Sequence, residues 1–173
     1  TATWPKHARA TGAATRLGRS IAIAMARTGW DIAIHYRSSA TDAESLRAEI
    51  NALGPEAVCL RADLDQPSEV EKLFIDACTA LPHLNCVINN ASRFEFDRPE
   101  SFDPNLLHAH IATNVVAPMR LTQLLHKHLS AAAGSHAHLS GEPAGVVIHL
   151  LDQKLSNPNP DFLSYTLSKA ALH

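Results

Sequence analysis

The sequence predicts an α/β protein built on a parallel, doubly wound sheet. Two observations support this fold class: short apolar runs alternate with amphipathic helical stretches, and each apolar run ends in a polar cluster. Parallel strands need crossover connections of helical length, and right-handed crossovers place the helices on both faces of the sheet. With 173 residues, no internal repeat and no second domain boundary, residues 1–173 are expected to form one domain.

The composition is that of an ordinary globular protein, with 46% hydrophobic and 18% charged residues. A net charge of −2 gives no electrostatic reason to expect nucleic acid or a membrane surface as partner. No apolar run approaches a membrane span, and the N-terminal "TATWPKHARATG" lacks the apolar core of a signal peptide. Three scattered cysteines favour a reducing compartment over a disulfide framework, so we expect a cytoplasmic protein.

A first strand is expected directly before the turn "TGAATRLG" (11–18), but the residues there are unusual. A central parallel strand is buried on both faces and is normally almost entirely apolar. The segment "PKHARA" (5–10) instead contains His7 and Arg9. The place of this segment before the turn predicts a strand, whereas its composition contradicts one.

The turn itself has features of a phosphate-binding loop. Gly12 and Gly18 allow the backbone to approach a pyrophosphate held at a helix N-terminus. Arg16 stands where such loops often have another glycine and offers a charged phosphate contact, next to Leu17. With only two glycines, the motif alone fits an ordinary strand-to-helix turn equally well.

The second strand, "WDIAIHY" (30–36), is followed by residues that distinguish the two nicotinamide cofactors. An enzyme that reads the free ribose hydroxyl of NAD carries an Asp or Glu about 20 residues past the glycines. Asp31 lies at the opposite end of the strand, whereas Arg37 and Ser38 offer a cation and a hydroxyl suited to a 2′-phosphate. We therefore predict NADPH as cofactor; the alternative is a solvated arginine in a loop.

Two segments are predicted to contain helices that pack on the sheet, "TDAESLRAEINALGP" (41–55), whose helix is stopped by Gly54 and Pro55, and "PSEVEKLFIDACTAL" (67–81). Their apolar residues at helical spacing are Leu46, Ile50 and Leu53 in the first, and Val70, Leu73, Phe74, Ala77, Cys78 and Leu81 in the second. "SAAAGSHAHLSGEP" (130–143) is small and polar and predicts a surface loop. Neither its "HAH" nor "HKH" (126–128) has the pattern of a metal site, so no metal is expected.

Three further strands are predicted at "EAVCLRADL" (56–64), "LNCVINNAS" (84–92) and "AGVVIHLLD" (144–152). Open parallel sheets bind ligands beyond the carboxyl ends of their strands, so the five polar clusters predict one site along one edge. The residues concerned after these three strands are Asp63, Leu64, Asn90, Ala91, Ser92 and Asp152. Asp63 is expected to bond an adenine or to cap a helix, and Asn90 to contact the cofactor or satisfy turn backbone.

The segment "DFLSYTLSKAALH" (161–173) places Tyr165 and Lys169 one helical turn apart. An ammonium group beside a phenol stabilises the phenolate. The pair is therefore predicted to be a proton donor and the group that tunes its pKa.

Taken together, "TGAATRLG", "NNAS", Asn114 and "YTLSK" resemble the short-chain dehydrogenase/reductase family, in the family's order, from about residue 10 onward. The resemblance implies a Rossmann-like fold in which Tyr165 is the general acid. It implies that Lys169 holds the nicotinamide ribose and lowers the pKa of the tyrosine. It also implies that Asn114 supports a proton-relay water, the alternative being an exposed asparagine on a helix.

The family usually carries a serine thirteen residues before the tyrosine, where this chain has Asp152. That aspartate, Arg16 in the glycine loop and Phe94 soon after "NNAS" resemble the pteridine reductase branch. The resemblance implies that Phe94 stacks on a pterin ring, that Ser92 bonds ring nitrogens or a cofactor phosphate, and that Asp152 supplies a proton to a ring nitrogen. The structural alternatives are a core position for Phe94 and a cap for Asp152.

Members of the family continue beyond the tyrosine helix, so the resemblance implies a single domain that lacks the last strands. It also implies a homo-oligomer, dimer or tetramer, for the intact protein. Three functions remain open: NADPH-dependent reduction of a dihydropterin-like small molecule, reduction of a carbonyl or 3-oxoacyl substrate, and cofactor binding by an inactive fragment.

Overall fold

The computed structural model describes residues 6–133 and 145–173, which contain a five-stranded parallel sheet in the order β3-β2-β1-β4-β5. The strands are β1 (His7–Ala10), β2 (Asp31–Tyr36), β3 (Ala57–Arg61), β4 (Leu84–Asn89) and β5 (Val146–His149). All four neighbouring pairs are parallel, which confirms the predicted fold class. From β1 the chain adds β2 and β3 on one side of the sheet and then returns to add β4 and β5 on the other side. Doubly wound sheets bind ligands where the strand order reverses in this way, here between β1 and β4.

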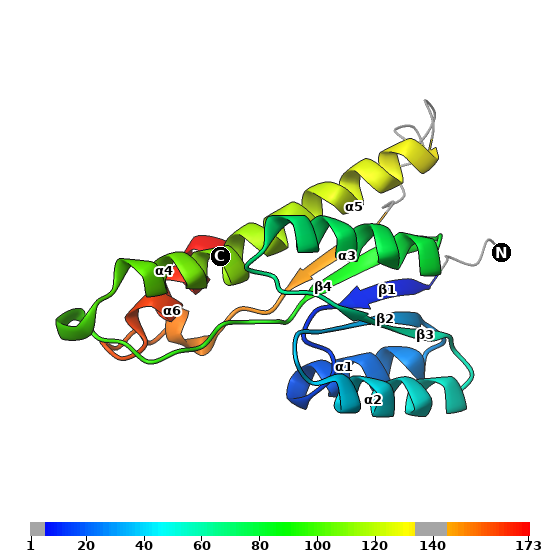
Figure 1. Cartoon of the computed structure of the whole chain (residues 1–173), viewed down its shortest axis with the longest axis horizontal. Helices are drawn as coiled ribbons and strands as arrows, with labels where there is room; N and C mark the ends of the chain where they lie inside the picture. The colour runs from blue at the N-terminus through cyan, green and yellow to red at the C-terminus, as the bar shows by residue number, and fades with distance from the viewer. Residues whose placement is uncertain (1–5, 134–144) are drawn as a thin grey trace.

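Helices cover both faces of the sheet and extend beyond one end (Figure 1). They are α1 (Arg16–Ala26), α2 (Ala40–Ala52), α3 (Pro67–Ala80), α4 (Pro104–Ile111), α5 (Ala117–Ala133) and α6 (Leu163–Leu172). The shorter turns are η1 (Pro99–Ser101), η2 (Ala112–Val116) and η4 (Gln153–Leu155). In Figure 1, α1 and α2 lie below the sheet and α3 and α5 above it, while α4 and α6 lie past the carboxyl ends of the strands.

Each face of the sheet has its own apolar layer. Leu46 and Ile50 of α2 are fully buried beneath one face, and Leu73 and Phe74 of α3 are buried on the other. Burial of each such side chain contributes about 1.5–3 kcal/mol. The predicted helical pattern is thus confirmed, except that Leu53 is 45% exposed because it is the C-terminal cap of α2 rather than part of its buried face.

Strand β1 forms although its composition argues against it. Its backbone is paired on both sides, and Arg9 lies opposite Ala33 of β2 and Val87 of β4. The Arg9 side chain is fully buried, and its three guanidinium nitrogens have no hydrogen-bond partner among the residues that the structure describes. Burial lowers the pKa of Arg9 to about 9, with the Cys78 thiol acting in the opposite direction. The polar residue seen in the sequence is therefore a true core residue.

The loop predicted at residues 130–143 is wrong at its start, because residues 130–133 belong to helix α5. Helix α5 continues through Ala133, because alanine is the strongest helix former and three alanines close the helix. The rest of that prediction, with the "HAH" tract, lies outside the described residues. In the described ranges, none of the helices combines the length and apolarity that a membrane crossing requires.

Candidate active site

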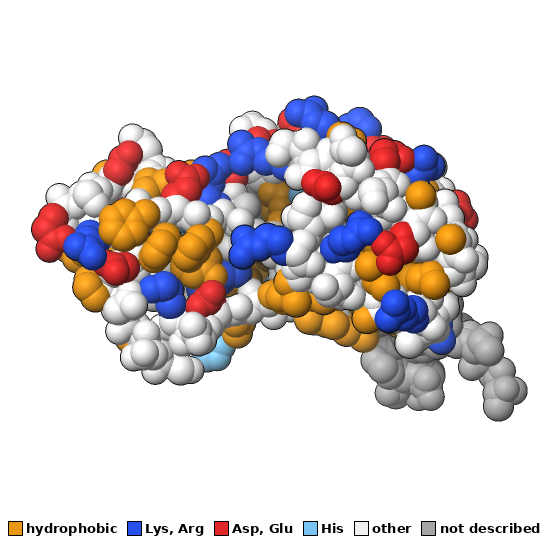
Figure 2. Space-filling view, turned by 90° about the horizontal axis from the view of Figure 1, so that it is seen from below, with side chains coloured by type: hydrophobic (Ala, Val, Ile, Leu, Met, Phe, Trp, Pro, Cys, Tyr) orange, Lys and Arg blue, Asp and Glu red, His pale blue; other side chains and the backbone are white. Residues whose placement is uncertain are grey.

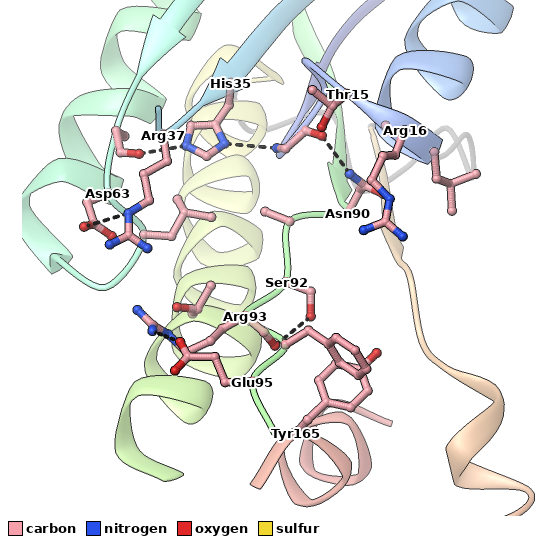
Figure 3. A pocket seen from close by; sticks show the side chains of 18 of the residues that line it. Thr15, Arg16, His35, Arg37, Asp63, Asn90, Ser92, Arg93, Glu95 and Tyr165 are labelled. Carbon is pink, nitrogen blue, oxygen red and sulfur yellow. Dashed lines mark hydrogen bonds and ion pairs between the residues drawn. The ribbon is translucent and has the colours of Figure 1, made fainter. Parts of the chain in front are cut away.

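The polar clusters at the strand ends surround one cavity of about 830 Å³ (Figure 3). The predicted residues that line it are Gly12, Arg16, Leu17, Gly18, Arg37, Asp63, Leu64, Asn90, Ala91, Ser92, Phe94, Asp152 and Tyr165. Ser38, Asn114 and Lys169 do not belong to this lining. Figure 2 shows the molecule narrowed at its middle, with Lys and Arg side chains gathered beside the hollow.

The glycine turn is compact because two glycines allow close approach. Gly12 has a φ of +59°, and a Cβ at Gly18 would collide with the carbonyl oxygen of Gly12. The amide of Asn90 donates from Nδ2 to the carbonyls of Thr11 (2.9 Å) and Gly12 (3.0 Å). Asn90 therefore fixes the turn backbone, as its second sequence interpretation expected.

The N-terminus of α1 opens on the cavity next to this turn. Its cap residue, Thr15, makes no side-chain capping bond within the part of the chain that the structure describes, and the first turn of the helix holds no acidic residue. Arg16 begins the helix with a φ of +52°, a conformation that is uncommon outside glycine. Free amides and the positive end of the helix dipole suit an anion such as a phosphate.

Arg37 and Asp63 lie together at the β2–β3 side of the cavity. Arg37 Nε is 3.2 Å from Asp63 Oδ2, and the arginine side chain is 60% exposed. Asp63 Oδ1 accepts from the amide of Asp65 at 3.1 Å. The helix-cap interpretation of Asp63 is wrong, because the N-cap of α3 is Gln66. Ser38 is exposed outside the cavity lining, whereas Arg37 lines the cavity and carries a positive charge that suits a phosphate.

Tyr165 and Asp152 are joined by a hydrogen bond inside the cavity. Tyr165 Oη donates to Asp152 Oδ2 at 2.6 Å, while Asp152 Oδ1 accepts from the amide of Lys154 at 2.9 Å and so caps η4. Burial raises the pKa of Tyr165, and its bond to Asp152 and the carboxylate charge raise it further. The same bond lowers the pKa of Asp152.

The pKa of Asp152 is lowered, whereas that of Tyr165 is raised. The supply of a proton by Asp152 and the effect of Lys169 on the tyrosine stay predictions. The Lys169 Nζ lies 5.7 Å from the tyrosine ring and donates to the carbonyl of Leu150 at 2.8 Å. Burial lowers the pKa of Lys169, and Asp152 acts in the opposite direction.

Asn114 lies in η2 and is buried, not exposed. Its Oδ1 accepts from the amide of Arg93 (2.8 Å) and from Ser92 Oγ (3.2 Å). Its Nδ2 donates to the Arg93 carbonyl (3.1 Å) and to Ser168 Oγ (2.8 Å). The side chain thus ties the segment after β4 to helix α6, and its part in a proton relay stays a prediction.

An aromatic group stands beside the tyrosine. Phe94 is 55% exposed, so its core interpretation is wrong. Its ring stacks on Phe162 at 4.2 Å between centroids and meets Tyr165 edge-on at 4.7 Å. Phe162 therefore covers one face of Phe94, and the rest of the Phe94 ring is exposed.

Several residues of the site were absent from the sequence prediction: Thr15, His35, Ala62, Arg93, Glu95 and Thr113 line the cavity, and Asp97 holds helix α6 from outside it. Arg93 forms ion pairs with Asp65 and Glu95. The sequence could have indicated a structural role for His35, because a histidine within an apolar strand needs buried hydrogen-bond partners. No group of three or more His, Cys, Asp or Glu residues in the described ranges is arranged to hold a metal.

The chain matches one family model and is similar to several known proteins. A family model described as short chain dehydrogenase matches residues 6–173. A short chain dehydrogenase/reductase of Aspergillus novofumigatus is 37% identical over 91 residues, which cover 53% of this chain and 34% of that protein. A 3-oxoacyl-[acyl-carrier-protein] reductase of Synechocystis sp. is 28% identical over 153 residues, which cover 79% of this chain and 62% of the relative.

Among solved structures, the crystal structure of FolM alternative dihydrofolate reductase 1 from Brucella suis, in complex with NADP, superposes with a TM-score of 0.86. The two sequences are 30% identical, and the match covers 98% of this chain and 66% of the Brucella protein. The chain therefore spans less than two thirds of the length of these relatives.

Proposed function

Because the chain belongs to the short chain dehydrogenase family, we propose that it is an oxidoreductase that transfers hydride from NADPH to a dihydropterin-like ring. The observation that carries the proposal is the 2.6 Å hydrogen bond from Tyr165 Oη to Asp152. Reduction of a ketone places negative charge on an oxygen, which a neighbouring carboxylate repels. Reduction of a ring carbon–nitrogen double bond instead adds a proton to nitrogen, which a carboxylate tolerates.

NADPH is proposed as cofactor on the chemistry of the cavity. The amides at the start of α1 suit a pyrophosphate, and the exposed Arg37 guanidinium suits a 2′-phosphate. The dihydrofolate reductase structure from Brucella suis was determined with NADP. When bound, the nicotinamide supplies the hydride.

The protein groups then have distinct proposed tasks. Tyr165 gives its proton to the ring nitrogen as the neighbouring carbon receives hydride, so the double bond becomes a single bond and the tyrosine becomes a phenolate. Asp152 orients the hydroxyl and keeps the proton on the tyrosine until then. Lys169 is proposed to hold the nicotinamide ribose and to face the phenolate that forms. Phe94 provides an aromatic surface for the substrate, and Ser92 a hydroxyl beside it.

The test follows NADPH oxidation with dihydrobiopterin by absorbance, with the full 173-residue chain. Tyr165→Phe is expected to reduce kcat by about 10²–10⁴-fold, the usual contribution of a general acid. Tyr36→Phe is the matched control, because Tyr36, the other tyrosine of the chain, does not line the cavity. Turnover that survives in Tyr165→Phe would remove the catalytic assignment.

A carbonyl or 3-oxoacyl reductase is the second candidate, favoured by the similarity to the Synechocystis reductase. Asp152→Ser tests the two candidate functions against each other, because a serine suits a carbonyl oxyanion and should favour ketone reduction over dihydropterin reduction. If the parent chain reduces ketones and not dihydropterins, the carbonyl reading holds. A chain that binds NADPH but turns over neither substrate would be a cofactor-binding module.

The remaining proposals concern the whole protein. Residues 1–173 are proposed to be one reductase domain that continues in the intact protein, and that protein is proposed to be a homo-oligomer. The exposed side chains of Met119 on α5 and Leu167 on α6 are apolar positions at which such a contact is testable. Sedimentation of the parent chain against Met119→Glu measures this directly.

A further inference from the structure

His35 is buried in β2, and both of its ring nitrogens are hydrogen-bonded to backbone groups. The amide of Gly12 donates to Nδ1 at 3.1 Å, and Nε2 lies 3.1 Å from the carbonyl oxygen of Ala62. Because a backbone N–H can only donate, Nδ1 is the acceptor and the proton is on Nε2, which donates to Ala62. The ring thus bridges the glycine turn after β1 and the end of β3 (Figure 3).

The glycine turn is held from the opposite side by a second residue. Asn90, which follows β4, donates to the carbonyls of Thr11 and Gly12. The backbone of residue 35 adds a bond, because the amide of Ala13 donates to its carbonyl at 3.1 Å. One side chain from β2 and one from the residue after β4 therefore hold the turn from its two sides. Gly12 is hydrogen-bonded through both its amide and its carbonyl.

We infer that His35 is a positioning residue for the cofactor: its ring holds the glycine turn in the conformation that receives a pyrophosphate. This inference rests on the proposed function, since it assumes that the turn binds NADPH. A turn that is already ordered loses little conformational entropy when the phosphate binds, whereas a loose turn must be ordered at the expense of affinity.

The charge state of His35 is compatible with this task. Burial lowers the pKa of His35 to about 4; Arg9 also lowers it, while the Ala62 carbonyl and Asp63 act in the opposite direction. The ring is consequently neutral at physiological pH, and Nδ1 keeps the lone pair that accepts from Gly12.

Two substitutions separate the two bonds of the ring. His35→Asn places an amide oxygen near the position of Nδ1 and keeps an acceptor for Gly12, while it loses the bond to Ala62. His35→Gln places an amide nitrogen near the position of Nε2 and keeps a donor for Ala62, while it loses the acceptor for Gly12. Both variants are polar and lose one buried hydrogen bond, so each serves as the stability control of the other.

The experiment measures the Kd for NADPH and the hydrogen exchange of the Gly12 amide in the full chain. We expect His35→Gln to weaken binding about tenfold and to expose the Gly12 amide, and His35→Asn to stay within about threefold of the parent. The Ala13 amide is the internal reference, because its partner is the backbone carbonyl of residue 35 in every variant. Equal Kd values for the two variants, or a Gly12 amide equally protected in both, would overturn the inference.

The inference about His35 is also tested if the parent chain does not bind NADPH or if His35→Gln does not fold. If the parent chain does not bind NADPH, the proposed function fails, while the exchange of Gly12 in the two variants still decides whether His35 clamps the turn. If His35→Gln does not fold, the nitrogen-15 shifts of His35 in the parent replace it. A ring protonated on Nδ1 would contradict the bond from Gly12 and with it the inference.

Discussion

The hydrogen bond between Tyr165 and Asp152 determines where the transferable proton resides at rest. Burial and the neighbouring carboxylate both raise the pKa of the tyrosine, while the bond lowers the pKa of Asp152. The result is a neutral phenol held 2.6 Å from an ionised carboxylate. Asp152 therefore keeps the proton on Tyr165 at rest, and its charge also disfavours the phenolate that proton donation would leave.

Asp152→Asn is therefore expected to lower the pKa of Tyr165. The substitution keeps a hydrogen-bond acceptor but removes the negative charge, which is one of the causes of the raised value. Phenolate absorbance measures the titration, and subtraction of the Tyr165→Phe curve removes the contribution of Tyr36, because the chain has two tyrosines. Asp63→Asn, in the same cavity, should leave the curve unchanged. An identical titration in Asp152→Asn and the parent would show that the carboxylate charge has no influence.

Arg9 is a single residue whose effect is on stability. Within residues 6–133 and 145–173 the buried guanidinium has no hydrogen-bond partner, and such a charge is costly. Replacement of buried charged groups by apolar ones of similar size often stabilises by about 1–4 kcal/mol. Arg9→Met is expected to raise the free energy of unfolding and the Tm. Arg9→Lys keeps the charge and should give no gain.

The pH dependence of the gain from Arg9→Met has a definite sign. The folded-state pKa of Arg9, about 9, is below the ordinary arginine value of 12.5 expected in the unfolded chain, so the unfolded chain binds more protons between these two pH values. The penalty is complete below pH 9 and decreases as pH rises above it. Urea unfolding should show the difference between Arg9→Met and the parent narrowing from pH 9 to 11. A difference that is zero at pH 7, or that widens with pH, would contradict this account.

At the scale of elements, helix α6 is held in place by one buried carboxylate, that of Asp97, which lies outside the cavity lining. Asp97 is 1% exposed, and its carboxylate accepts from the amide of Ser164 at 3.0 and 3.1 Å and from its hydroxyl at 2.5 Å. Its carbonyl accepts from the amide of Phe162 at 2.8 Å. Asp97 belongs to the same segment as Phe94, so it fixes the aromatic surface and the first turn of the tyrosine helix relative to each other.

Asp97→Ala is expected to destabilise the protein by about 1–3 kcal/mol, because it leaves the buried amide and hydroxyl of Ser164 without an acceptor. Ser164→Ala should cost less, and the double variant should show a coupling of about 0.5–3 kcal/mol. Asp103→Ala is the comparison, since Asp103 is the exposed N-cap of α4 and such caps contribute about 1 kcal/mol. Additive effects of Asp97→Ala and Ser164→Ala would exclude this coupling.

The elements differ in how well the sequence predicts them. Helix α3 is predictable because Pro67 marks its start and its buried residues recur at helical spacing. Strand β1 is not, because it has four residues, including Arg9, and its pairing with β2 and β4 arises from distant parts of the chain. The end of α5 was misplaced because small residues fit both a loop and a helix.

The same distinction applies to the site. The motifs predicted the cavity because the carboxyl ends of parallel strands meet at one edge, which brings Gly12, Asn90 and Tyr165 together. The contacts that tune those residues were not predictable. Asp97 contacts Ser164 across 67 residues, and His35 contacts Gly12 across 23, so no local pattern contains either pair.

At the scale of the molecule, the cavity joins parts of the fold that have little else in common. Arg37 comes from the end of β2, the glycine turn from β1, and Tyr165 from α6 past the carboxyl ends of the strands (Figure 1). A dinucleotide that contacts all of them is bound only by the fully folded chain. Its binding energy therefore adds to the stability of the whole sheet and not of one element.

NADPH is accordingly expected to raise the Tm of the chain more than NADH does. At a concentration of 100 times the Kd, a ligand that binds only the folded state adds about 2.7 kcal/mol, and about 1 kcal/mol shifts the Tm of a protein of this size by about 2–4 °C. Arg37→Ala should reduce the NADPH shift to the size of the NADH shift, because the exposed Arg37 guanidinium is the group proposed to bind the 2′-phosphate. Arg27→Ala is the matched control: Arg27 is exposed at the C-terminal cap of α1, outside the cavity lining, and should leave both shifts unchanged. Equal shifts for the two cofactors in the parent, or a preference that persists in Arg37→Ala, would show that the phosphate is read elsewhere or not at all.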